Sequence, residues 1–235
     1  MSGKQETLFY SSEGDQWFRR NRTALVGFDP ARDLPLRLMD LYQLRPKRVL
    51  EIGAANGYRL AEVNRRYGGE TVGVEASQEA VQDGRRRYPS VRLLRGQATR
   101  LPVRGTFDLI IVNFVFHWID RNLLLSAVAE LDRFLSDQGF LLLGDFSPAN
   151  RHRVPYHHVK DPSIQTFKQN YAELFLASGL YHPVAMLTNG HSSKVLSGGV
   201  PENERTGVWL LEKRLTDHYV PTSSVLGTQR KIRRP

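Results

Sequence analysis

Residues 49–57, Val-Leu-Glu-Ile-Gly-Ala-Ala-Asn-Gly, combine an acid with two glycines four positions apart. The apolar run that carries Glu51 ends at Gly53, and Gly57 opens the next segment. Glycines in such a turn let the backbone approach a ligand closely, because a side chain there would block it. A second acid, Glu75, ends another apolar run about two dozen residues later, where a carboxylate can accept both hydroxyls of a ribose.

Two ligand classes could use this turn. A dinucleotide needs room for its pyrophosphate at the helix N-terminus, usually with a third glycine that this turn lacks. Glu51 would also repel a phosphate. The acid suits a ligand with an amino group or a positive charge, such as S-adenosylmethionine, which has an α-ammonium, a sulfonium and a ribose but no phosphate. A tight strand-to-helix turn without any ligand is the remaining alternative.

The elements that position these residues alternate between short apolar strands and helices of about a dozen residues. Such alternation implies right-handed crossovers and a parallel sheet covered on both faces, which is a doubly wound α/β domain. Ligands of such sheets bind at the carboxyl ends of the strands. The expected strands are residues 48–53, 70–75, 91–94, 107–113 and 139–144, and the expected helices are residues 31–44, 58–67, 78–88 and 122–135.

The segments that flank this core are less regular. Residues 8–25 are consistent with one or two short helices, residues 148–164 with a loop, and residues 165–178 with a helix. Strands near residues 183–187 and 206–212 predict a hairpin-like ending.

Composition narrows the class of protein. Of the 235 residues, 40% are hydrophobic and 24% charged, which is typical of a globular chain and excludes a disordered one. The lack of cysteine excludes disulfides, thiolate zinc sites and cysteine nucleophiles. The sequence has no apolar run of about 18 residues and no signal-peptide core, so we expect a cytoplasmic protein without a membrane span. The net charge of +9 favours anionic partners in general.

The glycine turn resembles motif I of the class I S-adenosylmethionine-dependent methyltransferases. Glu75 matches the acid that binds the ribose at the end of their second strand. Residues 107–113 and 135–141 resemble their fourth-strand and fifth-strand motifs. The resemblance covers roughly residues 45–146 and is closest to the small-molecule branch, similar to methyltransferase type 11, whose members methylate sugars, nucleotide-linked sugars, metabolites or natural products.

This resemblance implies a Rossmann-like, mostly parallel sheet with an antiparallel final strand, and S-adenosylmethionine as the cofactor. The turn would pass beside the methionine part, and the residues after the third strand would bracket the adenine. The leader segment 17–21 also resembles leader helices of bacterial carbohydrate-linked methyltransferases. The cofactor-binding residues implied are Glu51, Gly53, Ala54, Asn56, Gly57, Glu75, Ala76, Gln97, Ala98, Asn113, Phe114 and Val115, with Trp17 and Asn21 from the leader.

The resemblance divides the chain into parts of a single methyltransferase domain. These parts are leader helices over residues 1–45, a cofactor-binding core over 46–146, an acceptor-binding cap over 147–205, a final strand within 206–220 and a flexible basic tail over 221–235.

Histidines are the candidate proton acceptors, because an imidazole can take a proton near neutral pH. His117 follows the fourth strand, and His157 and His158 follow the fifth. The competing interpretations are a packed Trp118 beside a surface His117, and a solvated polar loop at residues 151–158. The residues expected near the acceptor are Tyr156, Tyr171, Trp118 and Arg153. No metal is expected, because the spacing of His152, His157, His158 and Asp145 fits no standard zinc pattern.

The sequence therefore predicts a methyltransferase that acts on an oxygen or nitrogen of a small-molecule acceptor, such as a sugar, a nucleotide-sugar or a natural-product intermediate. An anionic acceptor would suit Arg151, Arg153 and Lys160. An RNA methyltransferase is the alternative that the charge favours, although residues 113–116 differ from the Asn-Pro-Pro-aromatic motif used on base amines. A cofactor-binding relative without turnover is a third interpretation. Nucleic-acid binding and oligomeric state stay open.

Overall fold

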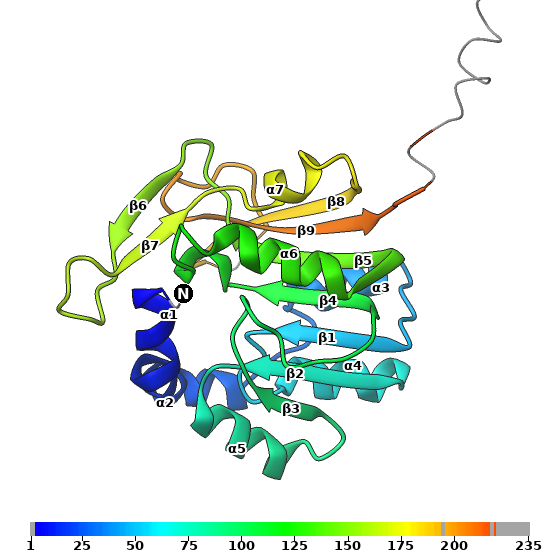
Figure 1. Cartoon of the computed structure of the whole chain (residues 1–235), viewed down its shortest axis with the longest axis horizontal. Helices are drawn as coiled ribbons and strands as arrows, with labels where there is room; N and C mark the ends of the chain where they lie inside the picture. The colour runs from blue at the N-terminus through cyan, green and yellow to red at the C-terminus, as the bar shows by residue number, and fades with distance from the viewer. Residues whose placement is uncertain (1–2, 194–195, 217–218, 220–235) are drawn as a thin grey trace, which may run out of the picture.

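The centre of the molecule is a seven-stranded sheet with the strand order β3-β2-β1-β4-β5-β9-β8 (Figure 1). The computed structural model describes residues 3–193, 196–216 and 219. Strands β1 to β5 run parallel, and β9 lies antiparallel to both β5 and β8. A separate antiparallel hairpin joins β6 to β7. The predicted Rossmann-like sheet with an antiparallel final strand is confirmed.

The elements follow one another as expected for a doubly wound domain, with a helical leader before the first strand. The strands are β1 (Arg48–Ile52), β2 (Glu70–Glu75), β3 (Arg92–Arg95), β4 (Phe107–Asn113), β5 (Leu135–Phe146), β6 (His152–Pro155), β7 (Gln165–Lys168), β8 (Tyr181–Gly190) and β9 (Arg205–Lys213). The helices are α1 (Lys4–Leu8), α2 (Gly14–Val26), α3 (Leu34–Leu41), α4 (Tyr58–Tyr67), α5 (Gln78–Arg87), α6 (Leu124–Phe134) and α7 (Ala172–Leu176), with a π-helical turn η1 (Phe9–Glu13) and a 3₁₀ turn η2 (Phe116–Trp118).

Side-chain alternation along β1 supplies both faces of the core. Leu50 and Ile52 pack with α6 and α7, whereas Val49 packs with α3 and α4 on the opposite face. Successive residues of a strand point to opposite faces, so Glu51 shares the face of Val49. An acid at this position is therefore directed toward α4 instead of into the α6 side of the core.

The leader and the hairpin lie at the edge of the sheet toward which the arrowheads of β1, β2 and β4 point, at the left of Figure 1. Asp15 of α2 accepts hydrogen bonds from the Ser77 hydroxyl (2.6 Å) and from the backbone N–H of Glu79 (3.0 Å) at the start of α5. The Gln5 side chain donates to the Trp118 carbonyl (2.6 Å) and accepts from the backbone N–H of Gln165 (2.6 Å). The N-terminal segment therefore covers the end of the sheet where ligands bind.

The prediction of a helix over residues 165–178 was wrong in its first part. Residues 165–168 form β7, whose burial alternates with period two, and they pair with β6 inside the segment predicted as a loop. The helix is limited to α7. The helix predicted over 31–44 is also shorter, because Asp33 caps the N-terminus of α3 by accepting from the backbone N–H of Leu36.

Two further predictions concern the C-terminal part of the chain and the absence of a membrane-spanning helix. Strand β9 occupies the first part of the expected final segment, and the predicted basic tail over 221–235 lies outside the described residues. Within the part of the chain that the structure describes, no helix has the length and apolar character needed to cross a membrane.

Candidate cofactor and acceptor site

The turn after β1 has the close-approach geometry that its glycines predict. Gly53 (φ +70°) and Gly57 (φ +81°) both adopt left-handed conformations. The backbone N–H groups of Gly53 and Ala54 donate to the Val74 carbonyl at 2.9 and 3.3 Å, which ties the turn to the end of β2. A Cβ at Gly53 would come within 2.5 Å of the Val115 side chain. The turn therefore lies directly against the segment that follows β4.

Glu75 faces this turn from the end of β2. Its two carboxylate oxygens accept from the backbone N–H groups of Ala55 (2.9 Å) and Ser77 (2.8 Å). Burial raises the pKa of Glu75, and these backbone donors oppose the shift. A carboxylate can accept about four hydrogen bonds, so Glu75 keeps acceptor capacity for the hydroxyls of a ligand.

Glu51 lies in a buried ion-pair network with α4 and the α3 cap. The side chain is 1% exposed, and its Oε1 pairs with the guanidinium of Arg59. Arg59 also pairs with Asp33 at 2.9 Å. Among the described residues, Oε2 of Glu51 is buried without a hydrogen-bond partner. Burial raises the pKa of Glu51 to about 7, while the charge of Arg59 opposes this and that of Asp33 adds to it.

The charges around the turn do not balance. The carboxyl groups of Glu51 and Asp33 share one guanidinium, that of Arg59, and the charge of the third acid, Glu75, further raises the pKa of Glu51. An excess of buried acids favours a cationic ligand and opposes a phosphate. This arrangement fits an ammonium or sulfonium group better than a pyrophosphate.

The leader closes the side of the site next to β3. Arg95 stacks over the Tyr10 ring at 4.0 Å and donates to the Ala76 carbonyl at 3.1 Å. The Gln97 amide donates to the Glu6 carbonyl at 3.3 Å, and Ala98 is buried beside it in the core. These contacts place the predicted adenine-side residues beneath the leader.

Trp17 and Asn21 of the leader differ in what they contact. Trp17 packs against the small cluster that contains Phe18 and Ala55, which brings it to the glycine turn. The Asn21 amide donates to the Trp17 carbonyl within α2.

A cavity of about 480 Å³ opens at the same edge of the sheet. Phe28, Asp33 and Arg59 line one side, and Asn113 and Phe114 line it at the end of β4. A cavity of this size can hold a small organic molecule.

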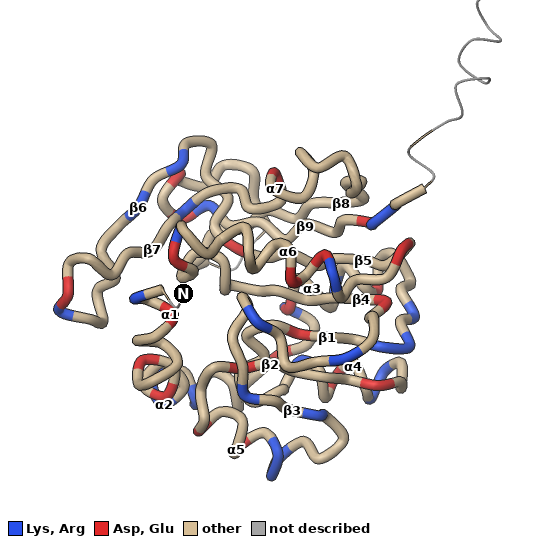
Figure 2. The backbone as a smooth tube through the Cα atoms, viewed as in Figure 1, with Lys and Arg blue, Asp and Glu red and all other residues tan. Residues whose placement is uncertain are grey.

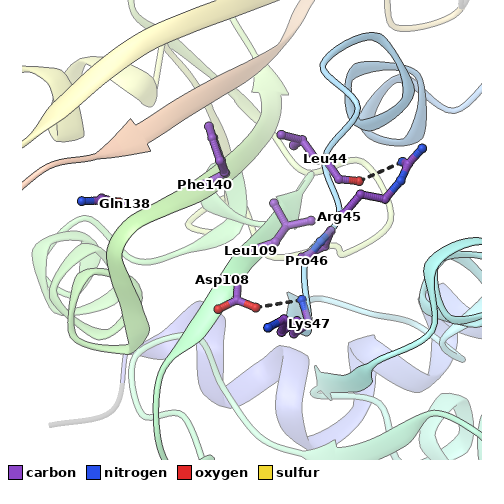
Figure 3. A pocket seen from close by; sticks show the side chains of 8 residues that line it. All are labelled: Leu44, Arg45, Pro46, Lys47, Asp108, Leu109, Gln138 and Phe140. Atoms are coloured by element: carbon purple, nitrogen blue, oxygen red, sulfur yellow. Dashed lines mark hydrogen bonds between the residues drawn. The ribbon is translucent and has the colours of Figure 1, made fainter.

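A second cavity, of about 320 Å³, lies at the amino-terminal ends of β1, β4 and β5 (Figure 3). Its acid, Asp108, accepts from the backbone N–H groups of Lys47 (2.8 Å) and Arg48 (3.0 Å). Asp108 therefore binds the backbone that leads into β1, at the end of the strand opposite to the glycine turn.

A histidine–aspartate pair joins the ends of β4 and β5. His117 Nδ1 lies 3.0 Å from Asp145 Oδ1, and its backbone N–H donates to Oδ2 at 3.1 Å. The backbone N–H of Phe146 donates to Oδ1 at 2.8 Å. The strands bring the pair together because Asn113 is in register with Gly144, one residue before Asp145.

Aromatic rings surround this pair. The ring centroids of Phe114 and Phe146 are 5.6 Å apart, and each lies 5.1–5.2 Å from His191. Phe114 has a left-handed backbone (φ +57°), a conformation that costs a residue with a side chain of order 1–3 kcal/mol and is typical of functional sites.

The comparisons agree with this geometry. A family model described as "Methyltransferase domain" matches residues 49–139. The malonyl-[acyl-carrier protein] O-methyltransferase of Halorhodospira halophila is 28% identical over 162 residues, which cover 65% of this chain and 54% of that protein. The demethylmenaquinone methyltransferase of Beutenbergia cavernae is 30% identical over 131 residues, which cover 55% and 52%. This chain spans about half the length of the curated relatives it matches.

A solved structure extends the likeness to nearly the whole fold. It is the 1,6-didemethyltoxoflavin-N1-methyltransferase of Burkholderia thailandensis with bound 1,6-didemethyltoxoflavin and S-adenosylhomocysteine, similar with a TM-score of 0.67 and 17% identity over 92% of each chain. Residues 49–139 therefore match a methyltransferase domain, and the fold of the chain is similar to that of this solved methyltransferase.

The fold brings only some of the predicted acceptor residues to the carboxyl end of the sheet. Trp118 is buried, and its indole N–H donates to the Gln5 carbonyl at 3.2 Å. Tyr156 donates to Glu13 Oε1 at 2.7 Å beneath the leader. Tyr171 is 2% exposed in the core and donates to the Phe167 carbonyl at 2.7 Å, so its burial argues against the predicted contact with an acceptor.

The polar loop predicted after the fifth strand lies at the surface of the molecule. Arg153, His157 and His158 are all exposed, and the two histidine rings are 3.9 Å apart. No group of three or more potential metal ligands occurs among the residues described.

The contacts of Asp145 and Arg59 are features of this site that the sequence analysis does not predict. From the sequence, Asp145 is a candidate only as a metal ligand, although a polar residue directly after the expected strand of residues 139–144 is itself a signal. Arg59 gave no such signal, because its place in the buried network depends on the packing of α3 against α4.

Proposed function

We propose that this chain binds S-adenosylmethionine at the glycine turn and transfers the methyl group to an oxygen or nitrogen of a small-molecule acceptor. The excess of buried carboxyl groups around the turn carries this proposal. It suits a ligand that is cationic at one end and carries a ribose at the other.

The residues present fit such a cofactor. The unpartnered Oε2 of Glu51 could accept from an ammonium group, which would give this buried oxygen its missing hydrogen bond. Glu75 could accept from the ribose hydroxyls, and the residues from Ala76 to Ala98 could hold the adenine beneath the leader. When bound, the cofactor would supply a methyl carbon activated by a positively charged sulfur. The protein would then align the acceptor and exclude water, which is where most of the rate gain in such a displacement arises.

Two features support a small acceptor. The cavity beside Asn113 and Phe114 is of a size suited to a metabolite, and the leader and the β6–β7 hairpin cover the same edge of the sheet (Figure 1). The relatives named above include enzymes named for menaquinone and toxoflavin precursors, both small organic molecules.

Calorimetric titration with S-adenosylhomocysteine tests the cofactor, with NAD as the control ligand. We expect micromolar binding of the first and none of the second. Glu75→Gln should weaken binding by about 10-fold to 100-fold, since an amide cannot accept at both positions and a hydrogen bond to a charged group contributes about 1.5–3 kcal/mol. Glu62→Gln is the matched control, because Glu62 pairs only with Arg65 and Arg66 on α4 among the described residues. Binding of NAD instead, or equal affinity in both variants, would contradict the proposal.

A gel-shift titration with a mixed transfer RNA pool tests the alternative. Among the residues that Figure 2 colours, Lys and Arg are spread over many elements and interspersed with acids, which supports a small acceptor over a nucleic-acid track. We expect no specific shift at physiological salt. A salt-sensitive complex at submicromolar protein would favour the RNA methyltransferase.

A further inference from the structure

The hydrogen bonds around Asp145 define the tautomer of His117. The Asp145 carboxylate receives the backbone N–H groups of His117 and Phe146, so it acts as an acceptor. An ionised carboxylate has no proton to give, and His117 Nδ1 must therefore carry the hydrogen of the 3.0 Å bond. In the neutral ring, Nε2 is then left with a lone pair. Nε2 makes no hydrogen bond within the described residues, and the His117 side chain is 17% exposed.

The charged and titratable groups packed around this pair come from four segments of the chain. Burial is the main cause that raises the pKa of the Tyr171 phenol, and the nearby charge of Asp145 is the second cause. Arg121 donates to the Tyr171 hydroxyl at 3.1 Å, Lys168 lies 4.2 Å above the Phe146 ring, and His191 contacts the same ring. None of these groups is hydrogen-bonded to the imidazole, so Asp145 is its one direct polar partner among the described residues.

The rings beside the pair offer flat apolar surfaces. Phe146 and Phe114 lie 5.4 and 6.1 Å from the His117 ring, both edge to face. Phe114 also lines the 480 Å³ cavity, which links the pair to space for a ligand. Aromatic side chains bind other rings by stacked or edge-to-face contact, each contributing about 0.5–1.5 kcal/mol beyond area burial.

We propose that His117 Nε2 accepts the proton that a planar aromatic hydroxyl or ring N–H acceptor loses on methylation, with Asp145 as the positioning residue. The acceptor's O–H or N–H bond breaks, an Nε2–H bond forms, and the imidazolium later returns that proton to solvent. Asp145 holds the ring in the required tautomer and stabilises the imidazolium. This inference rests on the proposed function and specifies the acceptor class for the same site.

Nitrogen-15 NMR of the imidazole ring tests the pair without any methyl transfer. In the complex with S-adenosylhomocysteine, neutral His117 should carry its proton on Nδ1, and His117→Gln identifies its signals. In Asp145→Asn the population should move toward the Nε2–H form, because an amide can also donate to Nδ1. A wild-type ring that is already protonated on Nε2, or an unchanged ratio in the variant, would overturn the role of Asp145.

Absorbance titration with 4-nitrophenol, whose phenolate is yellow, tests the acceptor class. We expect saturable binding to the S-adenosylhomocysteine complex with more phenolate than in buffer of the same pH. His117→Gln should lose this excess colour, Phe114→Leu should weaken binding by about 2-fold to 12-fold, and the matched control His182→Gln, at an exposed histidine of β8, should keep both. Absence of saturable binding, or full colour in His117→Gln, would overturn the inference.

The outcomes separate the inference from the proposed function. Each variant is first titrated with S-adenosylhomocysteine, which reports an intact fold and cofactor site. Failure of the wild-type chain to bind that ligand would refute the proposed function. Normal binding of it together with the contrary nitrophenol result would refute the inference alone.

Discussion

Glu51 shows how a single buried acid can be held ready for a cation. Its pKa lies near 7 because burial disfavours the carboxylate more than Arg59 favours it. Arg59 divides its charge between Glu51 and Asp33, so neither acid has a full partner. A bound ammonium would supply the missing charge and lower the pKa of Glu51.

This pKa predicts a specific pH dependence of stability. The folded-state pKa is raised, so the contribution of Glu51 is complete below about pH 4.5 and is lost as pH rises through about 7. Glu51→Gln cannot ionise, and its free energy of unfolding relative to the wild type should rise between about pH 5 and about pH 8. Urea unfolding at several pH values measures this difference. Parallel curves for the two proteins would contradict it.

The residues of the glycine turn could be predicted from sequence, because strand, turn and acid all lie within residues 49–57. Glu75 could be predicted in the same way, because the hydrophobic pattern shows where a strand ends. The pairing of His117 with Asp145 could not be predicted from the sequence. The two residues are 28 positions apart and are brought together by the register of β4 against β5. That register is a property of the assembled sheet.

At the scale of elements, a buried polar contact joins the leader to the β6–β7 hairpin region. Glu13 in η1 is 1% exposed, pairs with Arg20 of α2 and accepts from the Tyr156 hydroxyl at 2.7 Å. A buried carboxylate is stable only when its oxygens are hydrogen-bonded. Tyr156 therefore anchors the segment after β6 to the N-terminal helices.

Tyr156→Phe should lower the free energy of unfolding by about 1–2 kcal/mol, because Glu13 loses a donor in a buried position. Tyr42→Phe is the matched control. It should lower the free energy of unfolding by only a few tenths of the loss in Tyr156→Phe, because the Tyr42 hydroxyl bonds the Val184 carbonyl at an exposed site. Urea denaturation measures both. Equal effects of the two substitutions would mean that the Glu13 contact is not specific.

The β6–β7 hairpin could not be predicted from the sequence. The aromatic residues between 167 and 175 have a spacing that a helix would also satisfy, and the short β6 and β7 have only four residues each. Short apolar runs do not distinguish strand from helix by periodicity. The core strands were predicted because their apolar runs were bounded by turns and alternated with helices.

At the scale of the whole molecule, the leader holds together segments that a ligand would contact from several sides. It bonds Ser77 through Asp15 and stacks Tyr10 on Arg95. A ligand in the glycine turn would lie beneath it. Binding should therefore stabilise the leader and the sheet edge together.

Hydrogen–deuterium exchange measures this coupling. With S-adenosylhomocysteine at about 100 times its dissociation constant, the free energy of unfolding should rise by about 2.7 kcal/mol. Protection should appear in residues 4–26 as well as in 53–57. Protection confined to the turn would mean that the leader does not enclose the ligand.

The contacts of Gln5 have a consequence for synthesis of the protein. The side chain of Gln5 bonds Trp118 and Gln165, which follow it by 113 and 160 positions and are therefore made later. Long-range contacts of this kind form late, because the loop between the partners must close first. A nascent chain that already contains the complete glycine turn therefore still lacks the cover of its site, because the leader can take its place only after Trp118 and Gln165 have been made.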